Sequence, residues 1–324
     1  MFRDKPLRAA MARARNVLRL IALVGCAFVL IASPANAQDE ADDGAWVLDP
    51  FARVEAGIVL SESGDRENDL IINGDGGYLR AQIGITFGND TSELRLDADR
   101  IEVERFDSAT GRDGFNRDRL TAQFSQAIDD DWEVQLRGRL YDDLVTVESI
   151  DTDELQGSVQ VEYEPERAHR FRLRGTWRDR EYDDGEGVNG ASSTGQGPRV
   201  DFEYRHRIGR YHYINFDLRA EEINSANPDR AYTRESVGAS YTRPITRNLR
   251  VRPAIELRHT RFDGRFTVDA EERDDTQVVP EVELLWWTGN WRIEGEAKYI
   301  FSSSNDPSRD REGYRFAVSV GYVF

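Results

Sequence analysis

Apolar and polar residues alternate along most of the chain from residue 38 to the C-terminus, in runs of strand length. A period of two is typical of a β-strand with one apolar and one polar face, and this region holds no convincing helical period. The pattern therefore predicts an all-β fold of about 14 strands. They are expected at 51–60, 77–87, 91–104, 118–128, 131–141, 154–164, 169–179, 198–208, 211–222, 231–243, 248–261, 276–286, 290–301 and 312–324.

The connections between these strands alternate in length. Short ones lie at 88–90, 129–130, 165–168, 209–210, 244–247 and 287–289, and long polar ones lie at positions such as 61–76, 106–117, 180–197, 262–275 and 302–311. Short turns on one side and long loops on the other are typical of a transmembrane up-and-down antiparallel β-barrel. We therefore predict such a barrel over 51–324, with both of its ends on the short-turn side.

The two faces of each strand fit lipid and water respectively. In a membrane a sheet must close into a barrel, because only then does every backbone group find a partner. Aromatic residues collect on the apolar face near the short turns, as in an interfacial girdle: Phe87, Trp132, Tyr211, Tyr241, Trp286, Trp291, Tyr322 and Phe324. An antiparallel sandwich would also place aromatic residues near its strand ends, so the girdle alone does not decide the fold.

Two predicted strands fit this pattern poorly. In 91–104 the apolar alternation slips between Ala98 and Ile101, which suggests a β-bulge. The apolar face of 231–243 is weak, and it is the only hint of a contact between barrels. The sequence leaves the oligomeric state open.

The N-terminus has the three parts of a secretory signal peptide. Basic residues come first, an apolar run follows at 20–32, and Ala35-Asn36-Ala37 forms a small-residue cleavage site. We predict that 1–37 is removed, and that 38–50 is a short periplasmic segment ahead of the barrel. A lipoprotein signal with Cys26 as the lipidated residue is the alternative, although the apolar run continues past it. Cleavage after Ala37 would leave a chain without cysteine.

The closing run 312–324 ends on a phenylalanine, and its apolar positions are Phe316, Val318, Val320, Tyr322 and Phe324. This arrangement resembles the C-terminal signal strand of Gram-negative outer-membrane β-barrel proteins. The resemblance implies an integral outer-membrane location, with outer-membrane lipid and lipopolysaccharide around the barrel. It also implies that the barrel-assembly machinery binds this strand. The closing segment is similar to the ends of porin-like proteins and to the barrel of surface-lipoprotein assembly modifiers, through Arg273-Asp274-Asp275, Asn290-Trp291, Ser304-Asn305 and the final Gly321-Tyr322-Val323-Phe324.

Composition alone would suggest a water-soluble protein. Of the 324 residues 32% are charged, and the mean hydropathy is −0.65. A barrel exposes only every second residue to lipid, so its average hydropathy hides its location. The formal net charge of −17 argues against nucleic acid as a partner, because phosphate backbones bind basic surfaces.

Charged residues fill the faces that should line the lumen. A basic wall is expected on 169–179 and 198–208, from Arg170, Arg172, Arg174, Arg178, Arg205 and Arg207. We expect Arg178 to lie opposite Arg199 and Arg174 opposite Glu203, so that Arg170 and Arg172 face further arginines. An acidic wall is expected on 276–286 and 290–301, from Glu281, Glu283, Glu294 and Glu296.

Opposed charged walls resemble the constriction of general porins, where a transverse field orients polar solutes. The sequence therefore favours a porin-like channel for passive or weakly selective diffusion of small polar solutes. An equally simple interpretation is that the charges neutralise one another in a packed interior. A closed barrel would then serve as a surface scaffold, or as a translocation or assembly partner for surface proteins.

No residue pattern points to catalysis, a cofactor or a metal site. His206, His212 and His259 fall on the predicted lipid face, and His169 falls at a turn. The acidic runs at 65–69 and 183–186 lie in long loops and could bind calcium, but such runs are more often solvated loops. We therefore predict no catalytic residues, no metal and no cofactor.

Overall fold

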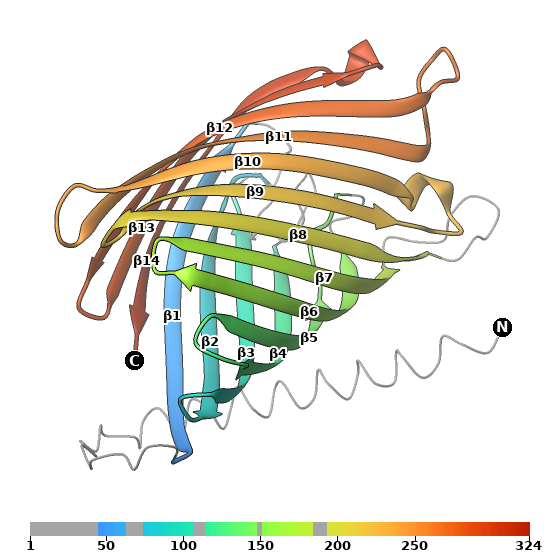
Figure 1. Ribbon diagram of the computed structural model, residues 1–324. Coiled ribbons are helices and arrows are strands. Elements are labelled where there is room, and N and C mark those ends of the chain that lie inside the picture. Colours follow the sequence, from blue (N-terminus) through green and yellow to red (C-terminus); the bar gives the residue numbers. More distant parts are fainter. Residues whose placement is uncertain (1–44, 63–73, 107–113, 148–150, 184–192) are drawn as a thin grey trace.

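The computed structural model describes residues 45–62, 74–106, 114–147, 151–183 and 193–324. These residues form a closed antiparallel barrel of fourteen strands in which each strand pairs with its sequence neighbours (Figure 1). The strands are β1 (Val47–Ser61), β2 (Gly76–Gly88), β3 (Ser92–Arg105), β4 (Phe115–Ala127), β5 (Trp132–Asp142), β6 (Thr152–Glu166), β7 (His169–Tyr182), β8 (Thr194–Gly209), β9 (His212–Ile223), β10 (Tyr232–Pro244), β11 (Leu249–Phe266), β12 (Glu272–Thr288), β13 (Trp291–Ser304) and β14 (Arg311–Val323). Two short 3₁₀ turns, η3 (Pro228–Arg230) and η4 (Pro307–Arg309), lie in long connections. Among the described residues, no helix is long and apolar enough to cross a membrane.

All fourteen predicted strands are present, and the predicted alternation of short and long connections is confirmed. The ends differ mainly where strands run further than their apolar pattern. β1 begins at Val47 instead of residue 51, β8 begins at Thr194 instead of residue 198, and β11 continues to Phe266. Backbone pairing does not require apolar side chains, so these strands continue after the alternation has ended.

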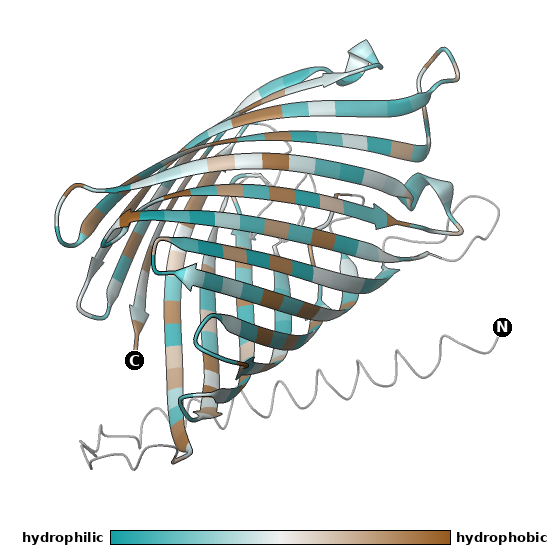
Figure 2. Ribbon diagram, in the orientation of Figure 1, coloured by the Kyte–Doolittle hydropathy of each residue, from teal (hydrophilic) through white to brown (hydrophobic). Residues whose placement is uncertain are grey.

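The outer surface carries the apolar positions of nearly every strand. Figure 2 shows apolar and polar bands alternating along the strands. Leu79, Val159 and Leu173 are among many large apolar side chains that are about half exposed. In water such an apolar surface would favour aggregation, whereas in a membrane it is covered by lipid chains.

An aromatic row runs around the outer face near the short turns of β5 to β9. Trp132 stacks on Tyr163 with ring centroids 4.3 Å apart, and Phe171 lies 4.9 Å from Tyr204. Tyr204 continues the row to Phe216 at 6.3 Å. This row extends the predicted girdle, since aromatic rings favour the level at which lipid headgroups meet hydrocarbon.

The predicted bulge in β3 is wrong. Pairing between β2 and β3 is unbroken from Gly76 opposite Arg105 to Gly88 opposite Glu93. The apolar alternation slips because Ile101 and Val103 face the lumen, where they form a cluster with Val59 and Tyr78. The inner face of the barrel is thus partly apolar near the long loops, which we call the external end.

The weak apolar pattern of β10 reflects the small residues on its inner face. Ser236, Gly238 and Ser240 lie opposite Arg219, Asp217 and Asn215 of β9 in the register of the sheet. Side chains this small leave the space above β10 unfilled. A cavity in the lumen therefore lies over the strand whose sequence pattern is least distinct.

Candidate functional site

The register between β7 and β8 differs by two residues from the predicted one. Arg174 lies opposite Asp201, and Arg172 lies opposite Glu203. Arg178 lies opposite Gly197 instead of Arg199. Because side chains alternate along a strand, a register shift of two residues leaves the same residues on the inner face. It places Arg172 and Arg174 opposite carboxylates, whereas Arg170 still lies opposite an arginine, Arg205.

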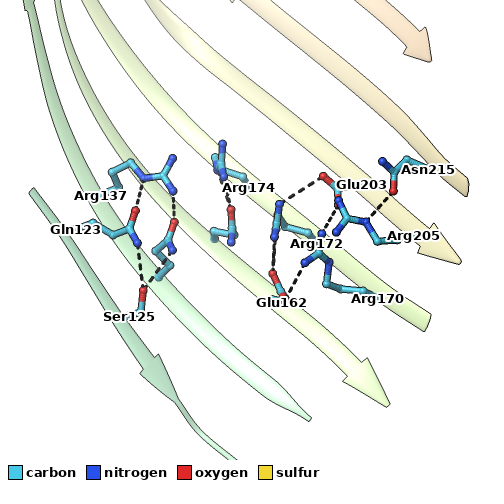
Figure 3. Close-up of polar contacts among 12 residues, drawn as sticks. Gln123, Ser125, Arg137, Glu162, Arg170, Arg172, Arg174, Glu203, Arg205 and Asn215 are labelled. Carbon is cyan, nitrogen blue, oxygen red and sulfur yellow. Dashed lines mark hydrogen bonds and ion pairs between the residues drawn. The ribbon is translucent and has the colours of Figure 1, made fainter. Parts of the chain in front are cut away.

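Part of the predicted basic wall is a network of shared ion pairs. Arg170 and Arg172 both bind Glu162 of β6 and Glu203 of β8, with nearest N–O distances of 2.8 Å for Arg172–Glu162 and 2.9 Å for Arg170–Glu203 (Figure 3). Arg205 donates from Nε to Asn215 Oδ1 at 2.8 Å. The three guanidinium groups share two carboxylates, so this belt keeps excess positive charge.

The remaining members of the predicted basic wall lie elsewhere. Arg178 is buried near the external end and pairs with Glu221 at 2.9 Å. Arg207 is exposed near the short turn that joins β8 and β9. The six arginines therefore occupy three levels of the barrel instead of one continuous surface.

The predicted acidic wall contains cations as well. Carboxylate oxygens of Glu281, Glu283 and Glu296 lie within 4.8 Å of one another. Arg252 contacts Glu283, and Glu296 pairs with Arg315 at 3.3 Å and with Lys298 at 3.7 Å. Glu294 accepts a hydrogen bond from Trp287 Nε1 at 3.2 Å. Much of the negative charge of this wall is thereby compensated.

A cavity of about 320 Å³ follows the inner surface from β7 to β12. Arg172, Arg174 and Arg199 line one side of it, and Glu256 and Glu281 line the other. The small side chains of β10 and Ala254 of β11 form its middle. The cavity therefore brings residues from both predicted walls to one polar space.

A segment of the connection between β5 and β6 folds into the barrel at the external end. Residues 144–147 are each at most 4% exposed. Val147 packs against Ile223, Tyr232 and Phe262, which belong to β9, β10 and β11. These strands lie on another part of the barrel wall, so the segment, which we call the inward segment, reaches across the lumen. The sequence analysis missed it, although Leu144 and Val145 are an apolar pair in a polar loop.

Buried ion pairs lie beside the inward segment. The Arg178–Glu221 pair and the Arg180–Glu154 contact each involve side chains at most 1% exposed. Tyr232 Oη lies 3.3 Å from both Glu221 Oε1 and Arg180 Nη1. Apolar packing and buried charge pairs together narrow the external end. Arg180 was not among the predicted site residues.

Carboxylates gather where the inward segment leaves β5. Side-chain oxygens of Asp143, Asp151 and Asp183 lie within 4.8 Å of one another, and Asp143 is equally close to Asp142 and Asp153. Burial, a hydrogen bond that protonated Asp143 donates to Asp151 and the neighbouring charges raise the pKa of Asp143 to about 8. No other feature of the described residues points to a metal ion bound by these aspartates, so we do not assign them as metal ligands. The other calcium candidates, 65–69 and 184–186, lie outside the described residues.

The four histidines lie on the outer face, three of them against tyrosines or each other. His169 Nδ1 lies 2.8 Å from Tyr204 Oη, and His212 Nε2 lies 2.7 Å from Tyr241 Oη. His259 approaches Asp274 and Thr276 at 3.2 Å, but both contact the same ring nitrogen. A general base needs one nitrogen for its nucleophile and the other for an orienting carboxylate. His259 does not have that arrangement.

Comparison with known proteins gives a clear result only at the level of structure. No family model matches the chain, and no curated protein matches it. OmpT of Vibrio cholerae, expressed in the outer membrane, matches with a TM-score of 0.53 at 10% identity, over 88% of this chain and 99% of its own. An anion-selective porin from Comamonas acidovorans matches with a TM-score of 0.51 at 6% identity, over 86% of this chain and 100% of its own.

The fold is that of an outer-membrane β-barrel. The closed sheet and its apolar outer surface make this an integral outer-membrane protein, as the terminal strand had indicated. At such low identity the matches concern the fold and carry over no residue roles.

The predicted C-terminal insertion signal lies on the outer face of the outer-membrane β-barrel. Phe316, Val318 and Val320 are exposed to the lipid side, and Tyr322 packs edge-on against Phe324 at 4.7 Å. The backbone N–H of Phe324 donates to the carbonyl oxygen of Ala52 at 2.9 Å. The signal residues therefore also belong to the strand that closes the barrel.

Proposed function

We propose that this outer-membrane β-barrel is a channel for passive or weakly selective diffusion of small polar solutes. The observation that supports the proposal most directly is the polar cavity between the arginines of β7 and β8 and the glutamates of β11 and β12. Charges of both signs around a cavity of about 320 Å³ favour polar over apolar solutes. The inward segment would set the width of the path at the external end. Lipopolysaccharide around the barrel and assembly through β14 belong to the same proposal.

A second candidate is a closed barrel that acts as a surface scaffold or as a translocation or assembly partner. The packed external end favours it, because the inward segment and the cluster of Val59, Tyr78, Ile101 and Val103 both occupy the lumen there. The two candidates differ in whether ions cross the barrel.

Single-channel recording of the refolded protein in a planar bilayer at high salt distinguishes them. Discrete, ohmic current steps are expected from a channel. Folded protein that inserts into the bilayer without carrying current would contradict the proposal and favour the scaffold.

Arg174→Glu should shift the ion selectivity of the channel toward cations. Arg174 lines the cavity and has no carboxylate within ion-pair distance among the described residues, so its replacement changes the field by two charges. The reversal potential in a salt gradient measures the shift. Arg100→Glu makes the same charge change on the outer face of β3 and should leave the potential unaltered. Equal potentials for the two variants would contradict the role of Arg174.

Conductance should rise with pH through the ionisation of Asp143. In the folded barrel its pKa is raised from 3.8 to about 8, so the inward segment is most stable in acid and loses stability as the pH rises toward 8. Ionised Asp143 would be repelled by Asp142, Asp151, Asp153 and Asp183, which surround it. Recordings at about pH 5 and about pH 9 test this expectation. Asp143→Asn should reduce the increase, and an unchanged increase would exclude Asp143 as its source.

A further inference from the structure

Three arginines on the inner faces of β5 and β7 have no carboxylate within ion-pair distance among the described residues. They are Arg137 and Arg139 of β5 and Arg174 of β7. Their hydrogen bonds go to neutral groups: Arg137 to Gln123 and Gln135, Arg139 to Tyr141, and Arg174 to Gln160. A carboxamide oxygen fixes a guanidinium group without neutralising it. These three side chains therefore keep their full positive charge.

The guanidinium group of Arg137 is hydrogen-bonded to two glutamines, and both glutamines are hydrogen-bonded to the same serine. Its Nε donates to Gln123 Oε1 at 2.9 Å, and its Nη2 donates to Gln135 Oε1 (Figure 3). Ser125 Oγ accepts from the amide nitrogens of both glutamines, at 3.4 Å and 3.2 Å. The guanidinium group is thus positioned in advance, while its remaining N–H groups are available to a ligand.

The clamps of Arg137 and Arg174 are direct neighbours. Gln135 lies opposite Gln160 in the pairing of β5 with β6, and Gln160 lies opposite Arg174 in the pairing of β6 with β7. Gln160 Oε1 accepts from Arg174 Nε at 2.9 Å. Paired residues on adjacent strands lie about 5 Å apart, so the two arginines are fixed on either side of β6.

The nearest carboxylates are already engaged by other cations. Asp201, opposite Arg174, binds both Arg199 and Arg219 at 2.7 Å. Glu162 and Glu203 are shared between Arg170 and Arg172. Asp201, Glu162 and Glu203 are therefore not available to neutralise Arg137, Arg139 or Arg174.

We propose that Arg137, Arg139 and Arg174 form a binding site for small carboxylate-bearing solutes inside the barrel. A carboxylate matches the planar fork of guanidinium N–H groups and would supply the charge that the site lacks. Arg174 also lines the cavity, so a solute bound there lies on the proposed path. The inference rests on the proposed channel function, to which it adds the class of solute.

Reversal potentials in a potassium chloride gradient test the charge of the site. We expect anion selectivity that the triple variant R137Q/R139Q/R174Q loses. Arg252→Gln is the matched control, because it removes a lumen arginine that is paired with Glu283. If the triple variant and Arg252→Gln shift the potential equally per charge removed, the site has no special role and the inference is wrong.

Binding of citrate to the detergent-folded protein, measured by titration calorimetry, tests the site independently of conduction. We expect saturable binding that the triple variant reduces at least tenfold. R137K/R139K/R174K should keep much of the anion selectivity but weaken citrate binding, because lysine lacks the bidentate fork.

The two experiments separate the two proposals. Citrate binding without current would uphold the site and overturn the channel. Current without citrate binding, or with binding that the triple variant retains, would uphold the channel and overturn the site. Unchanged heat-modifiability on gels would show that each variant has folded.

Discussion

L144S/V145S/V147S should raise the single-channel conductance several-fold. These side chains are almost completely buried at the external end, where Val147 packs against Ile223, Tyr232 and Phe262. Serine removes the apolar contacts that hold the inward segment in the lumen. Once released, the segment no longer narrows the path. Recordings in planar bilayers at high salt would measure the change.

A control for this experiment is available in another external connection. Val268 lies between β11 and β12 and is 89% exposed, so Val268→Ser should leave the conductance unchanged. If the triple serine variant conducts like the unaltered protein, the inward segment does not limit ion flow. The constriction would then have to lie deeper in the barrel.

Arg178→Gln should destabilise the barrel by about 3–5 kcal/mol, because it removes a cation that lies 2.9 Å from the buried carboxylate of Glu221. Both side chains are at most 1% exposed, so water cannot compensate for the loss. Urea unfolding in detergent micelles, followed by tryptophan fluorescence, would measure the effect.

Two further variants serve as controls for this unfolding experiment. Arg309 is exposed and pairs with Asp306 at 3.9 Å, and Arg309→Gln should destabilise the barrel far less than Arg178→Gln. R178M/E221L removes both charges and should be far less destabilising than Arg178→Gln alone. A double variant as unstable as the single one would show that packing, and not the charge of Glu221, determines the loss of stability.

The sequence predicted which residues face lipid and which face the lumen, because a strand alternates its side chains strictly. Predicting the partner of each residue requires the register, and the register depends on how far strands continue into their loops. β8 begins four residues before its expected start, and the partners of Arg172 and Arg174 changed accordingly. Among the described strands, the prediction of faces therefore failed only in β3, where apolar residues face the lumen, whereas the prediction of residue pairs between β7 and β8 failed throughout.

The inward segment and the cavity could not be predicted from the pattern of apolar and polar residues. Leu144 and Val145 are two apolar residues in a polar connection, and nothing local shows that they contact β9 to β11. The space above β10 depends on the sizes of side chains from six strands. The clamp around Arg137 escaped notice for the same reason, because Gln123 and Gln135 are unremarkable until β4 and β5 are paired.

The seam between β1 and β14 has a consequence for how the barrel forms. The other strand pairings join neighbours along the chain, so each of them can form as a hairpin. The seam joins Arg53 to Val323 across almost the whole sequence, and it contains nine residue pairs among the described residues. Closing so long a loop costs chain entropy that a hairpin does not. Before β14 pairs with β1, the sheet has two edge strands whose backbone N–H and C=O groups are unpaired and can bind other chains. The thirteen residues of β14 are therefore needed to close the barrel and to remove both edges.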